Sequence, residues 1–310
     1  MKRYFLLLLM AVQTAAFAQF KLNGKITHYT GGADVRINIP VVCGFFDQNS
    51  IRIPVTKDGS FSITLPIKSQ KFGHLFFNAD NYPLLLNSNK TLTVNLDANT
   101  KGLKFITGSA LPENTLLHST NPSEYPIFLQ DDKYTRLDLN ALNIQLLKPY
   151  LAARDRKIAL VNKSTVSAAD KKMIAAELRY IAYNYLHELT DLSAENPAAL
   201  NKLVADIYSK APIKPEVMPA GPQYYIFVNN YLQEAEKRTT GKQNLLTGRW
   251  QSAVKYLTAD IAQQFGYQLI TRAFYNGDPA QTKALISAYL QKFPTGVYTA
   301  DVRKKALSFR

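Results

Sequence analysis

Cysteine is nearly absent from this chain, which has one, Cys43, among 310 residues. A single cysteine excludes an internal disulfide and a CxxC redox pair. Cys43 stands in the apolar stretch VVCGFF, where a thiol packs as a small hydrophobic group and lacks the nearby positive charge that would activate it. We therefore expect Cys43 to be buried and inert.

Histidine is also scarce, with four in the chain. The pattern closest to a metal site is HELTD, His187 to Asp191, but a zinc-protease helix would carry a second histidine where Asp191 stands. The pair could share a cation, yet a catalytic zinc needs a third protein ligand, and no other histidine lies near in the sequence. We favour a surface histidine that closes a helix beside acidic neighbours.

Motifs for nucleophilic catalysis and phosphate binding are missing. No Gly-x-Ser-x-Gly elbow is present. The stretch TTGKQN contains a Gly-Lys pair, but Glu236 stands where a phosphate loop needs its first glycine. The sequence therefore assigns no catalytic, cofactor-binding or metal-binding residue and no cofactor, and we expect a protein that is not an enzyme.

The one long apolar run, FLLLLMAV, lies near the start and has about half of the ~20 residues that a membrane-spanning helix needs. It follows two basic residues and precedes Ala16 and Ala18, the positions that a signal peptidase inspects. We predict a signal peptide over residues 1–18, cleaved near Ala18, and a periplasmic or otherwise exported product. No cysteine follows the cleavage site, so a lipoprotein is not expected, and no later segment approaches a spanning length.

Acidic residues are outnumbered, 23 against 37 basic ones, which gives a net charge of +14. The basic residues are dispersed along the chain, and export argues against nucleic acid as a partner. We favour a solvated basic surface over a patch for anionic lipid or acidic polysaccharide.

Hydrophobic residues alternate with polar ones from about residue 20 to residue 107. Val35, Ile37 and Ile39 are one such set, and turn sequences such as KDGS separate the sets. Short strands at this spacing predict an antiparallel β-sandwich, which we place at residues 19–110. The proline-containing stretch that follows predicts a linker at 111–136 that includes one helical turn.

The period becomes helical beyond residue 137. Helix starts are marked by capping residues or prolines: Ser167 with Asp170, Asn196 with Pro197, Pro222, and Asp278 with Pro279. Residues 248–265 predict one further helix, and Pro149 is expected to kink the first. We predict an all-α bundle of six or seven helices over 137–310, and so an α+β protein in two parts.

Tyrosines gather in two of these predicted helices, within YIAYNYLHEL and YYIFVNNY. In the first, Ile174, Leu178, Ile181 and Tyr185 share one helical face. Tyr180 and Tyr183 lie on a different side, so no single groove would collect all the rings for stacking on a sugar or a base. We expect the tyrosines to pack between helices.

Three stretches, KDGSFSITLP, YPLLLNSNKTLTVNLD and FITGSALPENTLL, resemble the amino-terminal sandwich of exported TlpA-like thiol–disulfide oxidoreductases of the AhpC/TSA-related class. The closing stretch YLQKFPTGVYTADVRKK is similar to the helical segment that precedes their thioredoxin domain. The resemblance covers most of the chain after residue 18, through loose patterns without a catalytic signature.

The resemblance implies an accessory region rather than the catalytic one. The family's chemistry resides in a Trp-Cys-x-x-Cys motif, and neither Trp250 nor Cys43 matches it. We expect an exported, non-enzymatic accessory or binding module of the bacterial cell envelope, whose partner is an envelope component or a thioredoxin-fold protein. The alternative is a truncated or split oxidoreductase whose thioredoxin domain is missing from this chain. A third interpretation, a tetratricopeptide-like adaptor, lacks the expected 34-residue period.

Overall fold

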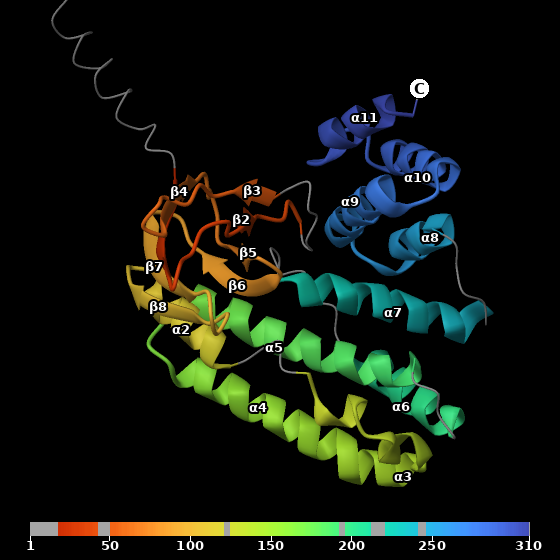
Figure 1. The fold of residues 1–310 in the computed structure, drawn as a ribbon. Helices are drawn as coiled ribbons and strands as arrows, with labels where there is room; N and C mark the ends of the chain where they lie inside the picture. Colours follow the sequence, from red (N-terminus) through yellow and green to blue (C-terminus); the bar gives the residue numbers. More distant parts are fainter. Residues whose placement is uncertain are drawn as a thin grey trace, which may run out of the picture. The chain divides into compact units, whose positions relative to one another are not determined.

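The computed structural model is an α+β protein with two four-stranded sheets (Figure 1). It describes residues 18–42, 50–120, 125–191, 196–211, 221–240 and 246–309, with the side chains of 191 and 237–240 left out. The predicted signal peptide up to residue 17 and Cys43 lie outside these ranges. The chain forms two compact units, which we call the sheet unit (Met1–Pro40 and Phe45–Thr120) and the helical unit (Val41–Gly44 and Asn121–Arg310).

The strands of the sheet unit are β1 (Phe20–Thr27), β2 (Val35–Asn38), β3 (Ser50–Arg52), β4 (Ser60–Leu65), β5 (Lys71–Phe77), β6 (Asp80–Leu86), β7 (Lys90–Asp97) and β8 (Leu103–Thr107). They form one sheet in the order β4-β1-β7-β8 and another in the order β3-β2-β5-β6. The second sheet is antiparallel, as predicted. In the first, β1 and β7 are parallel, so the prediction of purely antiparallel pairing was wrong there. The long stretch of chain between these two strands permits the crossover that parallel pairing requires.

One buried hydrophobic cluster draws on strands of both sheets, including Leu22 of β1 and Ile37 of β2. The alternation in the sequence correctly identified the buried side of β7, whereas in β2 Asn38, on the side predicted to be polar, is also fully buried. Leu92, Val94 and Leu96 of β7 are all fully buried, whereas the residues between them are partly exposed. Burial of every second side chain is what fixes the register of these strands.

Residues 111–119 form helix α2 (Leu111–Ser119), so the structure differs here from the predicted linker. The helix belongs to the sheet unit, and its Asn114 side chain is fully buried. The Asn114 amide pairs with the backbone of edge strand β6: Leu85 N–H donates to Asn114 Oδ1 at 2.8 Å, and Asn114 Nδ2 donates to Leu85 O at 3.0 Å. A side-chain amide thus replaces a neighbouring strand at this edge.

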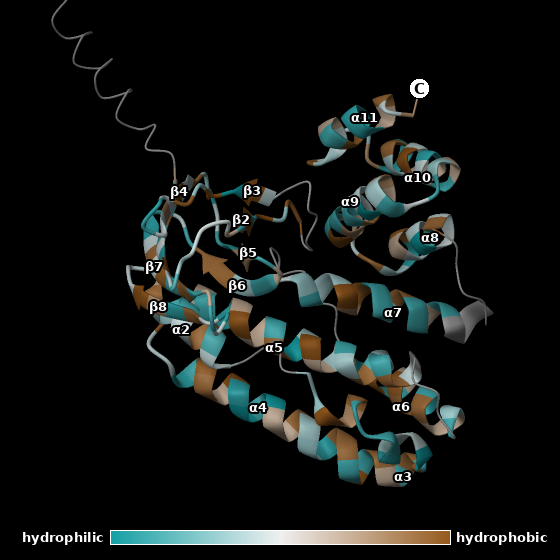
Figure 2. Ribbon diagram, viewed as in Figure 1, coloured by the Kyte–Doolittle hydropathy of each residue, from teal (hydrophilic) through white to brown (hydrophobic). Residues whose placement is uncertain are grey.

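The helical unit contains short turns η2 (Ile127–Leu129) and η3 (Asp132–Arg136), helix α3 (Leu139–Leu142) and the π-helical turn η4 (Asn143–Leu147). The remaining elements are α4 (Lys148–Lys163), α5 (Ala168–Glu188), η5 (Leu189–Asp191), α6 (Pro197–Lys210), α7 (Pro222–Thr240), α8 (Leu246–Tyr256), α9 (Ala259–Asn276), α10 (Pro279–Lys292) and α11 (Thr299–Leu307). Figure 2 shows hydrophobic and hydrophilic residues in alternating bands along α4 and α5. The residues of α5 are buried on most sides of the helix, including every residue from Met173 to Leu178.

The predicted helix starts are confirmed. Ser167 Oγ accepts from the backbone N–H of Asp170 at 3.1 Å and donates to its carboxylate at 2.6 Å. Asn196 Oδ1 and Asp278 Oδ1 cap α6 and α10 by accepting from the backbone N–H groups of Ala199 and Gln281, and each cap is followed by a proline in the first turn. Pro222 is the first residue of α7.

One other helix prediction needs correction, and the predicted kink at Pro149 coincides with an irregular turn. Residues 248–265 are not one helix, because α8 ends at Tyr256 and α9 begins at Ala259 after Thr258 in an extended conformation. Pro149 lies in the first turn of α4, directly after the π-helical turn η4. Proline has no backbone N–H to donate, so the hydrogen-bond ladder must change at this point. These breaks give more and shorter helices than the six or seven predicted.

The largest hydrophobic cluster of the helical unit is rich in aromatic rings. Tyr208, Tyr224 and Tyr289 are fully buried there, and Tyr180 is 2 % exposed. Tyr183 and Tyr185 are partly buried. The packing prediction for these tyrosines is therefore confirmed.

Candidate binding site

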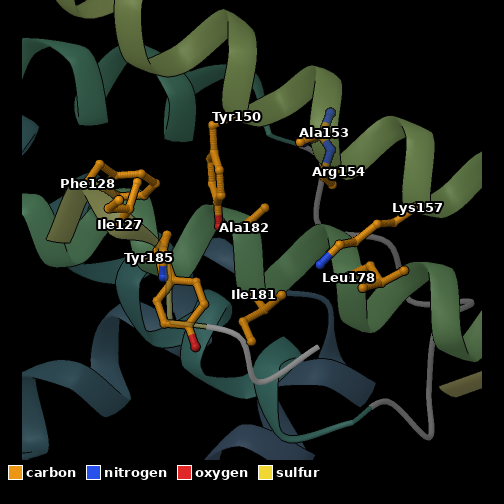
Figure 3. Close-up of a pocket in the computed structure, with 11 residues that line it drawn as sticks. Ile127, Phe128, Tyr150, Ala153, Arg154, Lys157, Leu178, Ile181, Ala182 and Tyr185 are labelled. Carbon is orange, nitrogen blue, oxygen red and sulfur yellow. The ribbon is translucent and has the colours of Figure 1, made fainter. Parts of the chain in front are cut away.

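A pocket of about 240 Å³ lies in the helical unit between α4, α5 and the turn η2 (Figure 3). The residues that line it are Pro126, Ile127 and Phe128 around η2; Tyr150, Ala153, Arg154 and Lys157 of α4; and Leu178, Ile181, Ala182 and Tyr185 of α5.

Both helices present residues to the pocket at the same spacing. The α4 positions 150, 153, 154 and 157, and the α5 positions 178, 181, 182 and 185, each follow the pattern i, i+3, i+4, i+7. This pattern places four side chains on one face over two helical turns. The pocket is therefore formed by two facing helical stripes.

The space exists because small residues stand in the middle of both stripes. Ala153 of α4 and Ala182 of α5 line the pocket, and a methyl group cannot fill the volume that a leucine would occupy. Aromatic rings form one wall, where Phe128 meets Tyr150 edge to face with 4.8 Å between ring centroids. Tyr150 extends from α4 towards α5 in Figure 3.

Two cations of α4 add charge to this apolar surface. The Arg154 side chain is only 14 % exposed. Its Nε and Nη2 atoms lie 2.9 and 2.8 Å from Asp155 Oδ1, and its guanidinium carbon lies 5.7 Å from the centre of the Tyr183 ring. The buried Nη1 has no hydrogen-bond partner within the described part of the chain. Lys157 extends its Nζ towards α5 in Figure 3.

Tyr185 contributes a hydroxyl near the edge of the pocket. Burial, followed by the charge of Glu188 and the neighbouring Tyr125, raises the pKa of Tyr185 above its usual value of 10.0. Its ring meets that of Tyr125 edge to face at 5.6 Å. The hydroxyl is therefore protonated at neutral pH and can donate a hydrogen bond.

His187, in contrast, is not the surface residue that the sequence predicted. It is 5 % exposed, and its Nε2 lies 3.3 Å from Glu234 Oε1 on α7. The side chain of Asp191 lies outside the described residues, so its relation to His187 is not defined. Among the side chains that the structure describes, no three histidines, cysteines or carboxylates gather as a metal site would require.

A polar seam between α5 and α7 was not predicted, because its members are single polar residues scattered through hydrophobic stretches. Asn184 Nδ2 donates to Gln223 O at 2.9 Å and to Gln223 Oε1 at 2.8 Å, and Asn230 Nδ2 donates to Asn184 Oδ1 at 3.4 Å. The seam also includes Glu177, which accepts from the backbone N–H of Gln223 at 3.3 Å. Burial raises the pKa of Glu177 to about 8. These groups orient the two helices and lie outside the pocket.

No protein-family model matches the chain. No curated protein matches it either. Within the described ranges, no helix is both long enough and apolar enough to cross a membrane.

Proposed function

We propose that this chain is an exported, non-enzymatic binding module of the cell envelope. In this proposal a β-sandwich, made of the two sheets around their common core, precedes an all-α bundle that carries the binding site. The observation that carries the proposal is the pocket between α4 and α5, where an apolar surface meets two basic side chains, Arg154 and Lys157. A concave apolar site with a few convergent polar groups is the usual form of a ligand site.

The types of side chain that line the pocket argue for binding rather than catalysis. Its lining supplies two cations and tyrosine hydroxyls, and no histidine, cysteine or carboxylate belongs to it. General acid–base or nucleophilic catalysis by a residue with a pKa near neutrality has no candidate among these side chains. Recognition of a ligand needs only the groups that are present.

The fluorescent anion anilinonaphthalene sulfonate tests the site, because it combines aromatic rings with one negative charge. We expect saturable binding to the folded protein. Ala153→Leu, which adds volume inside the pocket, should weaken binding several-fold. Ala152→Leu is the matched control: the same change on the neighbouring, exposed residue of α4 should leave binding unchanged. Equal binding by wild type and both variants would contradict the proposed site.

Export requires a separate test. Cleavage near Ala18 predicts that the intact mass of the secreted product begins at Gln19. Recovery of a product that retains Met1 would overturn this part of the proposal.

The resemblance to TlpA-like proteins adds one candidate partner, a thioredoxin-fold protein. We propose that the chain then acts as its accessory region and has no thiol–disulfide activity of its own. Dithiol exchange needs a second thiol to resolve the mixed disulfide, and this chain has a single cysteine. In an insulin-reduction assay with dithiothreitol, the rate should equal the blank. A rate above the blank that disappears in Cys43→Ser would contradict the non-enzymatic proposal.

A further inference from the structure

We infer that a pocket between α8 and α10 is a second binding site, which takes a sugar with an acetamido group, the acetyl carbonyl accepting a hydrogen bond from the indole N–H of Trp250. This site is separate from the α4–α5 pocket on which the proposed function rests. The residues that line it are Thr247, Trp250, Gln251 and Val254 of α8, and Ala288, Gln291 and Lys292 of α10. On each helix these positions are spaced three or four residues apart and so share one face.

Trp250 is held in one orientation by the side chains and backbone around it. Its benzo edge faces α9, where a β-carbon at Gly266 would lie only 2.4 Å from Trp250 Cζ3. Its ring also contacts those of Tyr289 and Phe293, with 5.6 and 6.0 Å between ring centroids. Because these contacts fix the ring, the indole N–H is positioned before any ligand arrives.

The indole N–H of Trp250 is an unused donor. It lies on the edge of the indole opposite Cζ3, away from Gly266. Trp250 is 4 % exposed. Among the described residues its Nε1 has no hydrogen-bond partner, and it is not one of the partnerless atoms that are closed to solvent. Since an indole N–H usually finds a partner when the ring is buried, the pocket that this ring lines is where the donor can meet an acceptor on a ligand.

The rest of the lining combines apolar and hydrogen-bonding side chains. Val254 and Ala288 contribute apolar contacts, whereas Gln251, Gln291 and Lys292 are exposed and polar. No carboxylate belongs to the lining within the described residues. A glutamine amide both donates and accepts, and so does a sugar hydroxyl, so each amide can pair with a hydroxyl in either direction.

An acetamido sugar matches these features together. Its acetyl carbonyl accepts from the Trp250 N–H, its methyl group contacts Val254 and Ala288, and its ring hydroxyls reach the amides of Gln251 and Gln291. A ligand that displaces water from the indole N–H without replacing the hydrogen bond loses affinity. A sugar without the acetyl group should therefore bind more weakly.

N-Acetylglucosamine is the direct probe, and the fluorescence of Trp250, the only tryptophan, reports its binding to the whole protein. We expect saturable binding with a dissociation constant on the order of 1 mM for a ligand of this size. Glucose, which lacks the acetamido group, should bind about tenfold more weakly. N-Methylacetamide, which has the amide and the methyl group without the sugar ring, should also bind about tenfold more weakly.

Two substitutions locate the site, and ligand-observed nuclear magnetic resonance measures binding to each variant. Trp250→Phe removes the N–H and keeps an aromatic ring, so it should weaken N-acetylglucosamine binding about tenfold and leave glucose binding unchanged. Ala288→Leu fills the pocket and should weaken binding several-fold. Ala280→Leu is the matched control, because it makes the same change at an exposed α10 position outside the lining, and it should have little effect.

The outcomes decide each part of the inference. Equal binding of glucose and N-acetylglucosamine, or an equal loss for both in Trp250→Phe, would overturn the contact between the acetyl group and the indole N–H. Binding of N-methylacetamide as tight as that of N-acetylglucosamine would overturn the assignment of a sugar. No saturable binding of N-acetylglucosamine, or equal effects of Ala288→Leu and Ala280→Leu, would overturn the site. The α4–α5 pocket is tested separately by Ala153→Leu.

Discussion

The cores of the sheet unit and the helical unit are built from different side chains. The buried cluster of the sheet unit consists of leucine, isoleucine, valine and phenylalanine, with one alanine. The largest cluster of the helical unit includes six buried tyrosines and Trp250, and a polar seam lies beside it. The first core depends on the removal of apolar surface from water, whereas the second also depends on hydroxyl and amide groups finding partners.

This difference teaches how each unit should respond to change. The apolar cluster of the sheet unit is sensitive to lost volume. Changes of pH act on this unit through buried groups outside the cluster, such as His74, whose pKa is lowered by burial. A core with buried polar and ionisable groups gains specificity from their hydrogen bonds, and its stability varies with pH. The predictions below test whether the two units differ in this way, beginning with the largest expected effect.

The first prediction concerns the apolar core. Leu65 of β4 is 1 % exposed, whereas its neighbour Thr64 points to the other side of the strand and is exposed. Leu65→Ala should lower the free energy of unfolding by about 3 kcal/mol, because a cavity remains where the side chain packed. Thr64→Ala should cost less than about 1 kcal/mol. Hydrogen exchange of the strands measures both, and equal costs would contradict the alternation on which the sheet unit was predicted.

The second prediction concerns the ionisable group in the seam. The unfolded carboxyl of Glu177 ionises above its usual pKa of 4.5, but the folded one keeps its proton until about pH 8. Between these values the unfolded state loses a proton that the native state retains, so the stability of the helical unit should fall as pH rises. Below 4.5 and above 8 this group should cause no further change.

Glu177→Gln should remove this pH dependence and stabilise the helical unit by about 2 kcal/mol at pH 8, since a neutral amide can still accept from Gln223 N–H. The fluorescence of Trp250, the only tryptophan, reports unfolding of this unit in urea. Asp206→Asn, at a half-exposed site on α6, is the control and should leave the slope unchanged. If the free energy of unfolding of the wild type does not change between pH 5 and 8, the pKa of Glu177 is not raised by burial and the prediction is wrong.

The comparison also explains what could be predicted from the sequence. Strand alternation and helix caps are local, so the strands near 35, 61 and 92 and the caps at Ser167, Asn196 and Asp278 were predicted correctly. The spacing of Leu178, Ile181 and Tyr185 also showed that they share one helical face, but the sequence analysis interpreted that face as packing and assigned no site residue. The pocket residues of α4 were not recognised, because Arg154 and Lys157 were counted among the dispersed basic residues of a solvated surface. The spacing of residues within one helix predicts which of them share a face. It does not predict that the faces of two helices pack against each other, because that depends on the tertiary structure.

Tertiary contacts also account for the corrections. His187 reads as a helix-closing surface residue until α7 brings Glu234 beside it. The prolines in residues 111–136 suggest a linker, but Pro112 lies in the first turn of α2, where a missing N–H has no cost. The membership of that helix in the sheet unit depends on the hydrogen bonds of Asn114 with Leu85, which are long-range contacts that no local sequence pattern shows.

The third prediction tests that membership. Asn114→Leu keeps a similar volume but removes both hydrogen bonds to Leu85, leaving an edge-strand N–H and C=O buried without these partners. The sheet unit should lose about 2 kcal/mol of unfolding free energy. Asn99→Leu, at an exposed turn position, is the control for the change of residue type. Hydrogen exchange of β6 measures both losses of stability. If the two substitutions lower the stability of β6 equally, α2 does not stabilise this edge, and the result would favour the interpretation of residues 111–119 as a linker.

The last prediction compares two buried tyrosines of the helical core. Tyr208 OH donates to Tyr183 O at 3.3 Å and receives a hydrogen bond from Asn230 Nδ2 at 3.5 Å, whereas Tyr289 OH has no hydrogen-bond partner among the described residues. Both side chains are fully buried, so phenylalanine preserves the ring packing of each. Tyr208→Phe should cost about 1 kcal/mol, because it leaves buried partners unpaired, and Tyr289→Phe should be neutral or slightly stabilising. Urea unfolding followed by Trp250 fluorescence measures both. Equal costs would mean that tyrosine contributes to this core only through its ring, in which case the helical unit would be stabilised by burial in the same way as the sheet unit.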